Sequence, residues 1–144
     1  MKIVIEEPSG GEEDQIVFRC RQLPPELLRI IGLLKAQDAL VAYLGSEIHR
    51  VRPSGVYYIE VVDGKTFLYC KDKVFESKQK LYELEETLAG GDFLRVSKST
   101  LLNFSKIRSL SPALSGRFEA SLDNGEKVII SRQYIGDIKK RFGI

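Results

Sequence analysis

Basic side chains gather in two stretches of the second half of the chain. Lysine and arginine can donate hydrogen bonds to phosphate oxygens and to the edges of nucleic-acid bases. A polyanion is therefore one candidate ligand, while an ordinary solvated basic face is the alternative that charge alone leaves open. The first stretch, residues 93–118, lacks acids and contains Arg95, Lys98, Lys106, Arg108 and Arg117. The second has one acid, Asp137, beside Arg132, Lys139, Lys140 and Arg141.

The net charge differs between the two parts of the chain. Residues 1–50 hold six Lys/Arg and eight Asp/Glu, a balance of −2, whereas residues 51–144 hold sixteen and twelve, a balance of +4. The net charge of the 144 residues is only +2, which excludes a histone-like polybasic mode of binding. With 43% hydrophobic and 29% charged residues, the composition is that of a globular protein and excludes global disorder.

No set of residues has the types and spacing of an active site. The single histidine, His49, has no serine or cysteine motif beside it, so we expect a structural or surface role. Glu85 and Glu86 lie on the outer side of an expected helix and are interpreted as solvated. Cys20 and Cys70 have neither metal nor redox spacing; one disulfide is conceivable, but reduced thiols are expected. We therefore predict that the protein is not an enzyme and needs no cofactor.

The first fifty residues are expected to form a small ββαββ unit. Alternating apolar and polar residues predict two strands, at residues 1–7 and 15–21. Helical spacing of leucine and isoleucine predicts a helix over residues 27–34. Two short strands, at residues 39–44 and 47–51, follow as a hairpin. The most plausible boundary is at residues 53–55, which gives an extension at residues 1–52 and a second domain at 53–144.

The second domain is expected to be mainly β. A helix of about three turns over residues 81–88 is predicted to stop at Gly90 and Gly91, and another is predicted over residues 133–142. Turn dipeptides at Asp63–Gly64 and at residues 123–125 predict two hairpins. The expected strands cover residues 56–62, 65–71, 74–76, 93–97, 107–110, 117–122 and 127–131.

Two motifs carry a resemblance to a known family. The sequence FLRVSKS at residues 93–99 is followed by Asn103, and SRQY at residues 131–134 precedes the last helix. Their order and spacing resemble those of LytTR DNA-binding domains over about residues 50–144. The resemblance implies a mainly β (α+β), elongated fold of small sheets with a middle and a C-terminal helix, without a helix-turn-helix. It also implies a free-standing bacterial transcriptional regulator. A receiver domain is not expected, because the first fifty residues are too few to form one.

The resemblance also implies which residues read DNA. Family members set loops into successive major grooves on one face of the duplex, usually as two copies on direct repeats. The three reading loops fall at Asp63, Gly64 and Lys65, at Ser97, Lys98 and Ser99, and at Arg132 and Gln133. Many members have histidine where Ser97 stands, and some have asparagine where Lys98 stands. The base preference of the second loop is therefore expected to differ, and Lys98 could bind either a phosphate or a guanine there.

The side-chain chemistry is consistent with these implied contacts. Lys98 and Arg132 can donate to guanine O6 and N7, and Gln133 can pair with adenine. Phosphate contacts are expected from Lys65, Arg95, Ser99 and Asn103.

Structural alternatives stay open for several of these residues. Arg95 could form a salt bridge with Asp92 or Glu119, and Asn103 could be a buried turn residue that satisfies backbone groups. Arg132 could lie free in solvent. Tyr134 is favoured as a core residue because it shares a helical face with Ile138.

The expected partners are double-stranded DNA and a second copy of the chain, with no small-molecule substrate. The family resemblance also implies a membrane-bound inhibitor protein as a further partner. No signal peptide or membrane-spanning segment is visible, so a cytoplasmic location is expected. The second hypothesis is a protein-interaction module without DNA binding, based on the acidic extension and its apolar helix. In either case residues 1–52 could form the contact surface for a second copy of the chain or for a regulatory partner.

Overall fold

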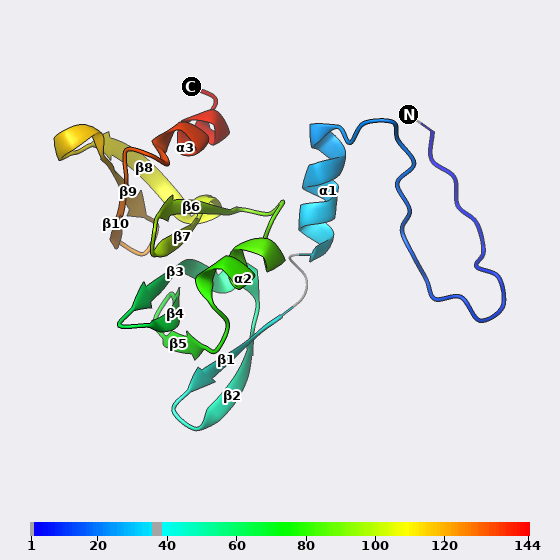
Figure 1. Cartoon of the computed structure of the whole chain (residues 1–144), viewed down its shortest axis with the longest axis horizontal. Coiled ribbons are helices and arrows are strands. Elements are labelled where there is room, and N and C mark those ends of the chain that lie inside the picture. The colour runs from blue at the N-terminus through cyan, green and yellow to red at the C-terminus, as the bar shows by residue number, and fades with distance from the viewer. Residues whose placement is uncertain (1, 36–38) are drawn as a thin grey trace.

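The computed structural model of the chain describes residues 2–35 and 39–144. Figure 1 shows the arrangement of the helices and strands. The described helices are α1 (Pro25–Lys35), α2 (Leu81–Thr87) and α3 (Ile135–Phe142). The described strands are β1 (Leu40–Leu44), β2 (Glu47–Val51), β3 (Val56–Val62), β4 (Lys65–Cys70), β5 (Val74–Ser77), β6 (Phe93–Ser97), β7 (Thr100–Asn103), β8 (Ile107–Pro112), β9 (Phe118–Leu122) and β10 (Lys127–Ile130).

The amino-terminal arm, residues 2–22, contains no strand, so the prediction of two strands here is wrong. The side chains of Ile3 and Ile5 are 87% and 93% exposed, because no surface covers the apolar side of this segment. A strand pair that packs against nothing is at best marginally stable in water. The expected ββαββ unit is therefore only a helix and a hairpin, and the arm runs as an open loop beside α1 (Figure 1).

Seven strands form one antiparallel sheet in the order β2-β1-β5-β4-β3-β7-β6. The β-branched and aromatic residues of β3 suit a central position, where this strand pairs with β4 on one side and β7 on the other. β1 joins the sheet through β5, where Tyr43 lies opposite Glu76. The strands before and after Pro53 thus share a sheet, and the division between residues 52 and 53 remains a prediction.

The two faces of this sheet support two hydrophobic cores. Successive residues of a strand point to opposite faces, and in β7 Leu101 belongs to the first core and Leu102 to the second. The first core packs the sheet against Leu84 and its neighbours in α2. The second packs it against a three-stranded sheet, ordered β10-β9-β8, and against Ile138 of α3. The predicted mainly β architecture with a middle and a terminal helix is confirmed.

The helices are short, and α1 lies at the side of this scaffold. α2 has seven residues, about two turns rather than three, because the chain turns at residues 88–92 before β6. α1 confirms the predicted helix, with Leu27 buried and the side chains of Leu28 and Leu33 exposed. Its Gly32 lies so close to Gly90 that a Cβ atom at residue 32 would be 1.8 Å from the Gly90 carbonyl oxygen.

Of the helices within residues 2–35 and 39–144, none is both long and apolar enough to cross a lipid bilayer. Cys20 and Cys70 are both free thiols, as expected.

Candidate nucleic-acid interface

Three connections between strands and helices lie side by side on the flank of the molecule that faces away from α1 (Figure 1). They are residues 63–65, 97–99 and 131–133, and we call them the turn cluster. Two backbone hydrogen bonds link connections to the strands next to them: Val61 N of β3 donates to Ser99 O at 2.9 Å, and Ser131 N donates to Val96 O of β6 at 2.8 Å. The three reading loops implied by the sequence are thus brought together.

The first connection is the tight turn between β3 and β4. Asp63 and Gly64 have φ values of 51° and 74°, as a two-residue type I′ hairpin turn requires. Aspartate and glycine are among the residues that adopt this left-handed conformation at low cost. The turn is therefore compact, and the side chains of Asp63 and Lys65 are exposed.

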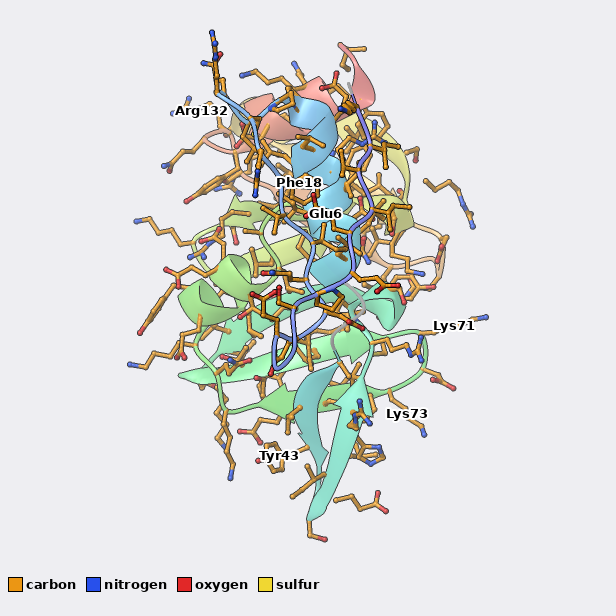
Figure 2. All side chains as sticks on the ribbon, turned by 90° about the vertical axis from the view of Figure 1, so that its right-hand side faces the viewer. Glu6, Phe18, Tyr43, Lys71, Lys73 and Arg132 are labelled. Carbon is orange, nitrogen blue, oxygen red and sulfur yellow. The ribbon has the colours of Figure 1, made fainter. Side chains whose placement is uncertain are left out.

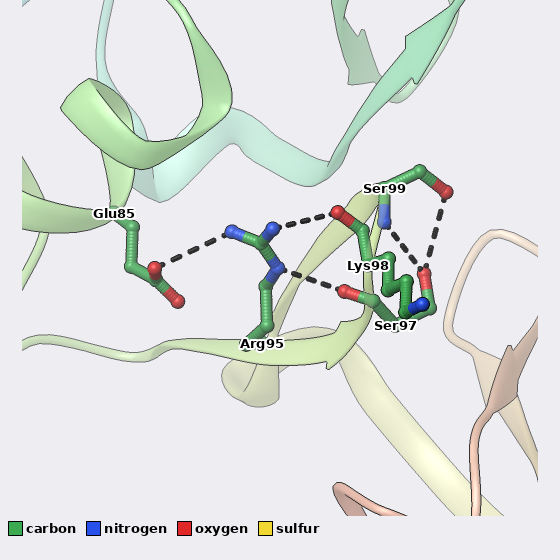
Figure 3. A network of polar contacts seen from close by, with 5 residues as sticks. All are labelled: Glu85, Arg95, Ser97, Lys98 and Ser99. Atoms are coloured by element: carbon green, nitrogen blue, oxygen red, sulfur yellow. Dashed lines mark hydrogen bonds and ion pairs between the residues drawn. The ribbon is translucent and has the colours of Figure 1, made fainter.

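The second connection joins β6 to β7 and is organised by its own polar groups (Figure 3). Ser99 N donates to Ser97 Oγ at 3.2 Å, and the two serine hydroxyls lie 3.4 Å apart. The Lys98 side chain is exposed to solvent. The strand register shifts between Arg95 and Ser97 as β6 approaches the turn.

The Lys98 side chain is exposed to solvent, whereas the Arg95 side chain is partly buried and makes internal contacts. Its guanidinium donates to Ser97 O at 2.8 Å and to Lys98 O at 2.6 Å, and lies 3.3 Å from Glu85 Oε1. The alternative of a salt bridge is confirmed, but both suggested partners are wrong. Asp92 pairs with Arg141 and Glu119 with Lys127. The expected phosphate contact of Arg95 competes with three internal acceptors.

The third connection carries Arg132 and Gln133 between β10 and α3, and both side chains are exposed. The stem of Arg132 packs against Gly116: a Cβ atom there would lie 2.8 Å from Arg132 Cδ. Gly116 also has a φ of 73°, which favours glycine. Figure 2 places Arg132 near the α3 end of the molecule and Tyr43 near the opposite end. Tyr134 packs against the second core, as favoured from the sequence.

Asn103 is not available to DNA, and its expected phosphate contact is wrong. The residue is 1% exposed. Its Nδ2 donates to Val56 O at 2.8 Å, while its Oδ1 accepts from Ser105 N at 3.0 Å and Ser105 Oγ at 2.7 Å. The structural alternative, a buried turn residue that satisfies backbone groups, is the one observed.

A groove of about 480 Å³ lies beside the turn cluster, between the two sheets. Ser97 and Ser99 form part of its wall, and Arg117 and Lys127 bring two cations to it. No specific role for Arg117 or Lys127 could be predicted from sequence, because only the pairing of β9 with β10 places them beside the β6–β7 turn. The pKa of Tyr58, which also lines the groove, is raised by burial and then by the nearby Glu126 carboxylate.

The charges of the turn cluster are free to act on a ligand. Among the residues that the structure describes, none of Lys65, Lys98 and Arg132 forms an ion pair. The acids of the amino-terminal arm belong to the opposite flank, beside α1 (Figure 1). Within the described part of the chain, the cluster therefore presents three cations without an ion-pair partner, with Asp63 as its own exposed carboxylate and Glu60 in the adjoining groove.

The remaining residues considered for catalysis or metal binding contact neighbouring side chains of the fold. His49 Nε2 lies 3.3 Å from Glu47 Oε1, and its ring packs 5.1 Å from the Phe75 ring. Glu85 was interpreted as solvated from sequence, but it is half-buried and contacts Arg95. Over the residues that the structure describes, no three His, Cys, Asp or Glu side chains are grouped to hold a metal ion.

Known proteins share both the sequence pattern and the fold. The chain is 27% identical to the sensory transduction protein LytT of Enterococcus faecalis over 97 residues, which cover 67% of this chain and 40% of that protein. It is 30% identical over 118 residues to an uncharacterized HTH-type transcriptional regulator of Staphylococcus aureus strain NCTC 8325, covering 82% of this chain and 80% of that one. Despite the name of that relative, strands separate the successive helices described in this chain. The chain thus spans less than half of the first relative.

A solved structure agrees with the sequence matches. The LytTr DNA-binding domain of a methyl-accepting/DNA response regulator from Bacillus cereus matches with a TM-score of 0.69 at 28% identity, covering 74% of this chain and 98% of that domain. The family model of the LytTr DNA-binding domain matches residues 46–143, which include the whole turn cluster. The chain therefore belongs to the LytTr DNA-binding domain family.

Proposed function

We propose that this chain is a sequence-specific transcriptional regulator whose turn cluster reads double-stranded DNA. The observation that carries the proposal is the position of three short connections on one flank, each bearing a cation without an ion-pair partner among the described residues, with backbone hydrogen bonds from two of them to the neighbouring strands. The family is a DNA-binding one rather than an enzyme class. The names of its relatives, a sensory transduction protein and transcriptional regulators, support a regulatory role.

Each connection would contribute a different kind of contact. Lys98 and Arg132 would donate to guanine O6 and N7, and Gln133 would pair with adenine. Lys65, Ser99 and the groove cations Arg117 and Lys127 would bind phosphate oxygens, which position the protein without reading sequence.

We extend the proposal to the assembly on DNA. Because the three connections lie along one flank, they suit successive major grooves on one face of the duplex, and two copies would occupy a promoter direct repeat as a homodimer. Residues 1–52 would serve the second copy or a membrane-bound inhibitor protein, since α1 leaves Leu28, Ile30 and Leu33 exposed. Such a regulator would work in the cytoplasm, where promoters are accessible.

The test is to select bound fragments from genomic or random DNA and measure binding by gel shift at several salt concentrations. Lys98→Ala and Arg132→Ala should each weaken binding to the selected site by about 1–3 kcal/mol, while binding to unrelated DNA changes less. Lys73→Ala is the matched control, because this exposed lysine follows the other end of β4 and lies toward the opposite end of the molecule from Arg132 (Figure 2).

Two results would contradict the proposal. The first is the recovery of no preferred site at moderate salt, which would favour the alternative of a protein-interaction module. The second is a Lys73→Ala effect as large as those of Lys98→Ala and Arg132→Ala, because it would mean that the cations act only through general charge.

A further inference from the structure

The guanidinium of Arg95 lies beneath the β6–β7 turn and touches both residues that begin it. Its Nε donates to Ser97 O at 2.8 Å and its Nη2 to Lys98 O at 2.6 Å (Figure 3). The planar, five-donor guanidinium can hold two carbonyls in fixed relative positions, whereas a lysine ammonium acts as a compact point charge. The geometry therefore ties the backbone of the turn to one side chain of the preceding strand.

The third donor of Arg95 fixes the guanidinium itself. Nη1 lies 3.3 Å from Glu85 Oε1 of α2, and the Arg95 side chain is 23% exposed. α2 is anchored in the first core by Leu81 and Leu84, and Leu88, directly after the helix, is buried in the same core. Contacts therefore run without a break from α2 through the Glu85 carboxylate and the Arg95 guanidinium to the β6–β7 turn.

We propose that Arg95 is a positioning residue for DNA reading: it sets the shape of the turn that presents Lys98, and Glu85 holds Arg95 in place. The inference rests on the proposed function, since it assigns Lys98 as the residue that meets the base. Arg95 is then not a phosphate ligand. Its positive charge is directed at two internal carbonyls and one carboxylate, and Lys98 is the cation left facing solvent.

The distinguishing variant is Arg95→Lys, compared with Arg95→Gln. Lysine keeps the charge but cannot reproduce the fork. If Arg95 positions the turn, both variants should weaken binding to the selected site by about tenfold or more, because hydrogen bonds from a charged donor are lost in each. If Arg95 contacts phosphate, Arg95→Lys should bind nearly as well as the unmodified protein, and that result would overturn the inference.

The matched control is Arg141→Lys. Arg141 also contacts one carboxylate, Asp92 at 2.9 Å, and one backbone carbonyl, Gly91 O at 3.3 Å, but it lies on α3 outside the turn cluster. Its replacement should leave DNA preference unchanged. An equal loss in Arg141→Lys would show that the effect is general to surface arginines and would overturn the inference.

A second readout does not depend on DNA. Trypsin cleaves after Lys98 only when the turn opens, and the cleavage rate follows the open population when opening is fast. Loss of the clamp in Arg95→Gln should accelerate scission of the Lys98–Ser99 bond by about tenfold or more, measured by mass spectrometry. Unchanged scission would overturn the inference even if DNA binding fell. Accelerated scission in a protein with no preferred DNA site would uphold the clamp while the proposed function failed.

A variant in α2 tests the same contact without altering Arg95, so the inference stays testable if the Arg95 variants misfold. Glu85→Ala removes the carboxylate and should accelerate the same scission more weakly than Arg95→Gln. Its neighbour Glu86, which is exposed on the same helix, supplies the control Glu86→Ala, with no acceleration expected. Equal rates in the two glutamate variants would show that Glu85 does not hold Arg95 and would overturn that part of the proposal.

Discussion

The amino-terminal arm and β3 have similar sequence patterns but different structures. Both contain short runs of Ile and Val, yet β3 is a central strand and the arm contains no strand. Ile59 in β3 is fully buried, whereas Ile5 in the arm is 93% exposed. The difference lies in the neighbours, because β3 has a strand on each side and a core on each face. A strand pattern is therefore realised only where the rest of the chain supplies partners.

The turn cluster and the arm also differ in charge and in constraint. The cluster is built from three short connections, two between paired strands and one between β10 and α3, and its cations face solvent. The arm has 21 residues between Lys2 and Gln22 and includes the acids Glu6, Glu7, Glu12, Glu13 and Asp14. Short connections on a rigid scaffold can place side chains reproducibly, whereas a long exposed segment cannot.

The largest expected contrast is in stability. Ile59→Ala should lower the free energy of unfolding by about 2–5 kcal/mol, because it removes buried methyl groups and leaves a cavity. Ile5→Ala, the same substitution in the arm, should change it by less than about 0.5 kcal/mol. Urea unfolding followed by circular dichroism measures both. Similar losses in the two variants would mean that the arm packs on the sheets in solution.

A smaller effect is expected at the contact between α1 and the scaffold. In Gly32→Ala the new methyl group would meet the Gly90 carbonyl oxygen, so α1 must shift at a cost of about 1–3 kcal/mol. Hydrogen exchange should accelerate in α1 and not in β3 or β4. Gly136→Ala in α3 is the control, because no atom lies within 4 Å of its Cβ position; it should stabilise the protein by about 0.5–1 kcal/mol. Unchanged exchange in Gly32→Ala would place α1 elsewhere.

The two thiols give the smallest contrast, which changes reactivity rather than stability. Cys20 in the arm is exposed, whereas burial, and then the nearby Asp72 carboxylate, raise the pKa of the half-buried Cys70 thiol. The thiolate is the reactive form, so iodoacetamide at pH 8 should modify Cys20 several-fold faster than Cys70. The Cys70 rate should keep rising at pH values above the ordinary thiol pKa. Equal rates by mass spectrometry would contradict this assignment of burial.

The scaffold was largely predictable from sequence because its signals are local. Turn dipeptides such as Asp63–Gly64 set hairpin positions, and the strands and helices from residue 25 onward were found within a few residues, except β7, which was not among the expected strands. The two strands predicted in the arm are the exception. The alternation of apolar and polar residues cannot reveal whether the rest of the chain supplies a partner strand or a surface to pack on. The close approach of Gly32 to Gly90 was also invisible, because it depends on how a helix crosses a distant loop.

The candidate site was predictable in position but not in every role. The motifs at residues 93–99 and 131–134 located two of the three connections. Asn103 and Arg95 have side chains that could serve DNA, but each also donates to an acceptor on another element, Val56 O for Asn103 and Glu85 Oε1 for Arg95. The packing of Gly116 against Arg132 likewise arises only when β9 and β10 pair.

Hydroxyl-radical footprinting on the selected DNA site would show whether the three connections on one flank meet one face of the duplex. We expect protected backbone positions that recur about every 10 base pairs on one face, one helical turn apart. Lys98→Ala and Arg132→Ala should weaken different protected segments. Continuous protection around the duplex, or loss of the same segment in both variants, would contradict the account.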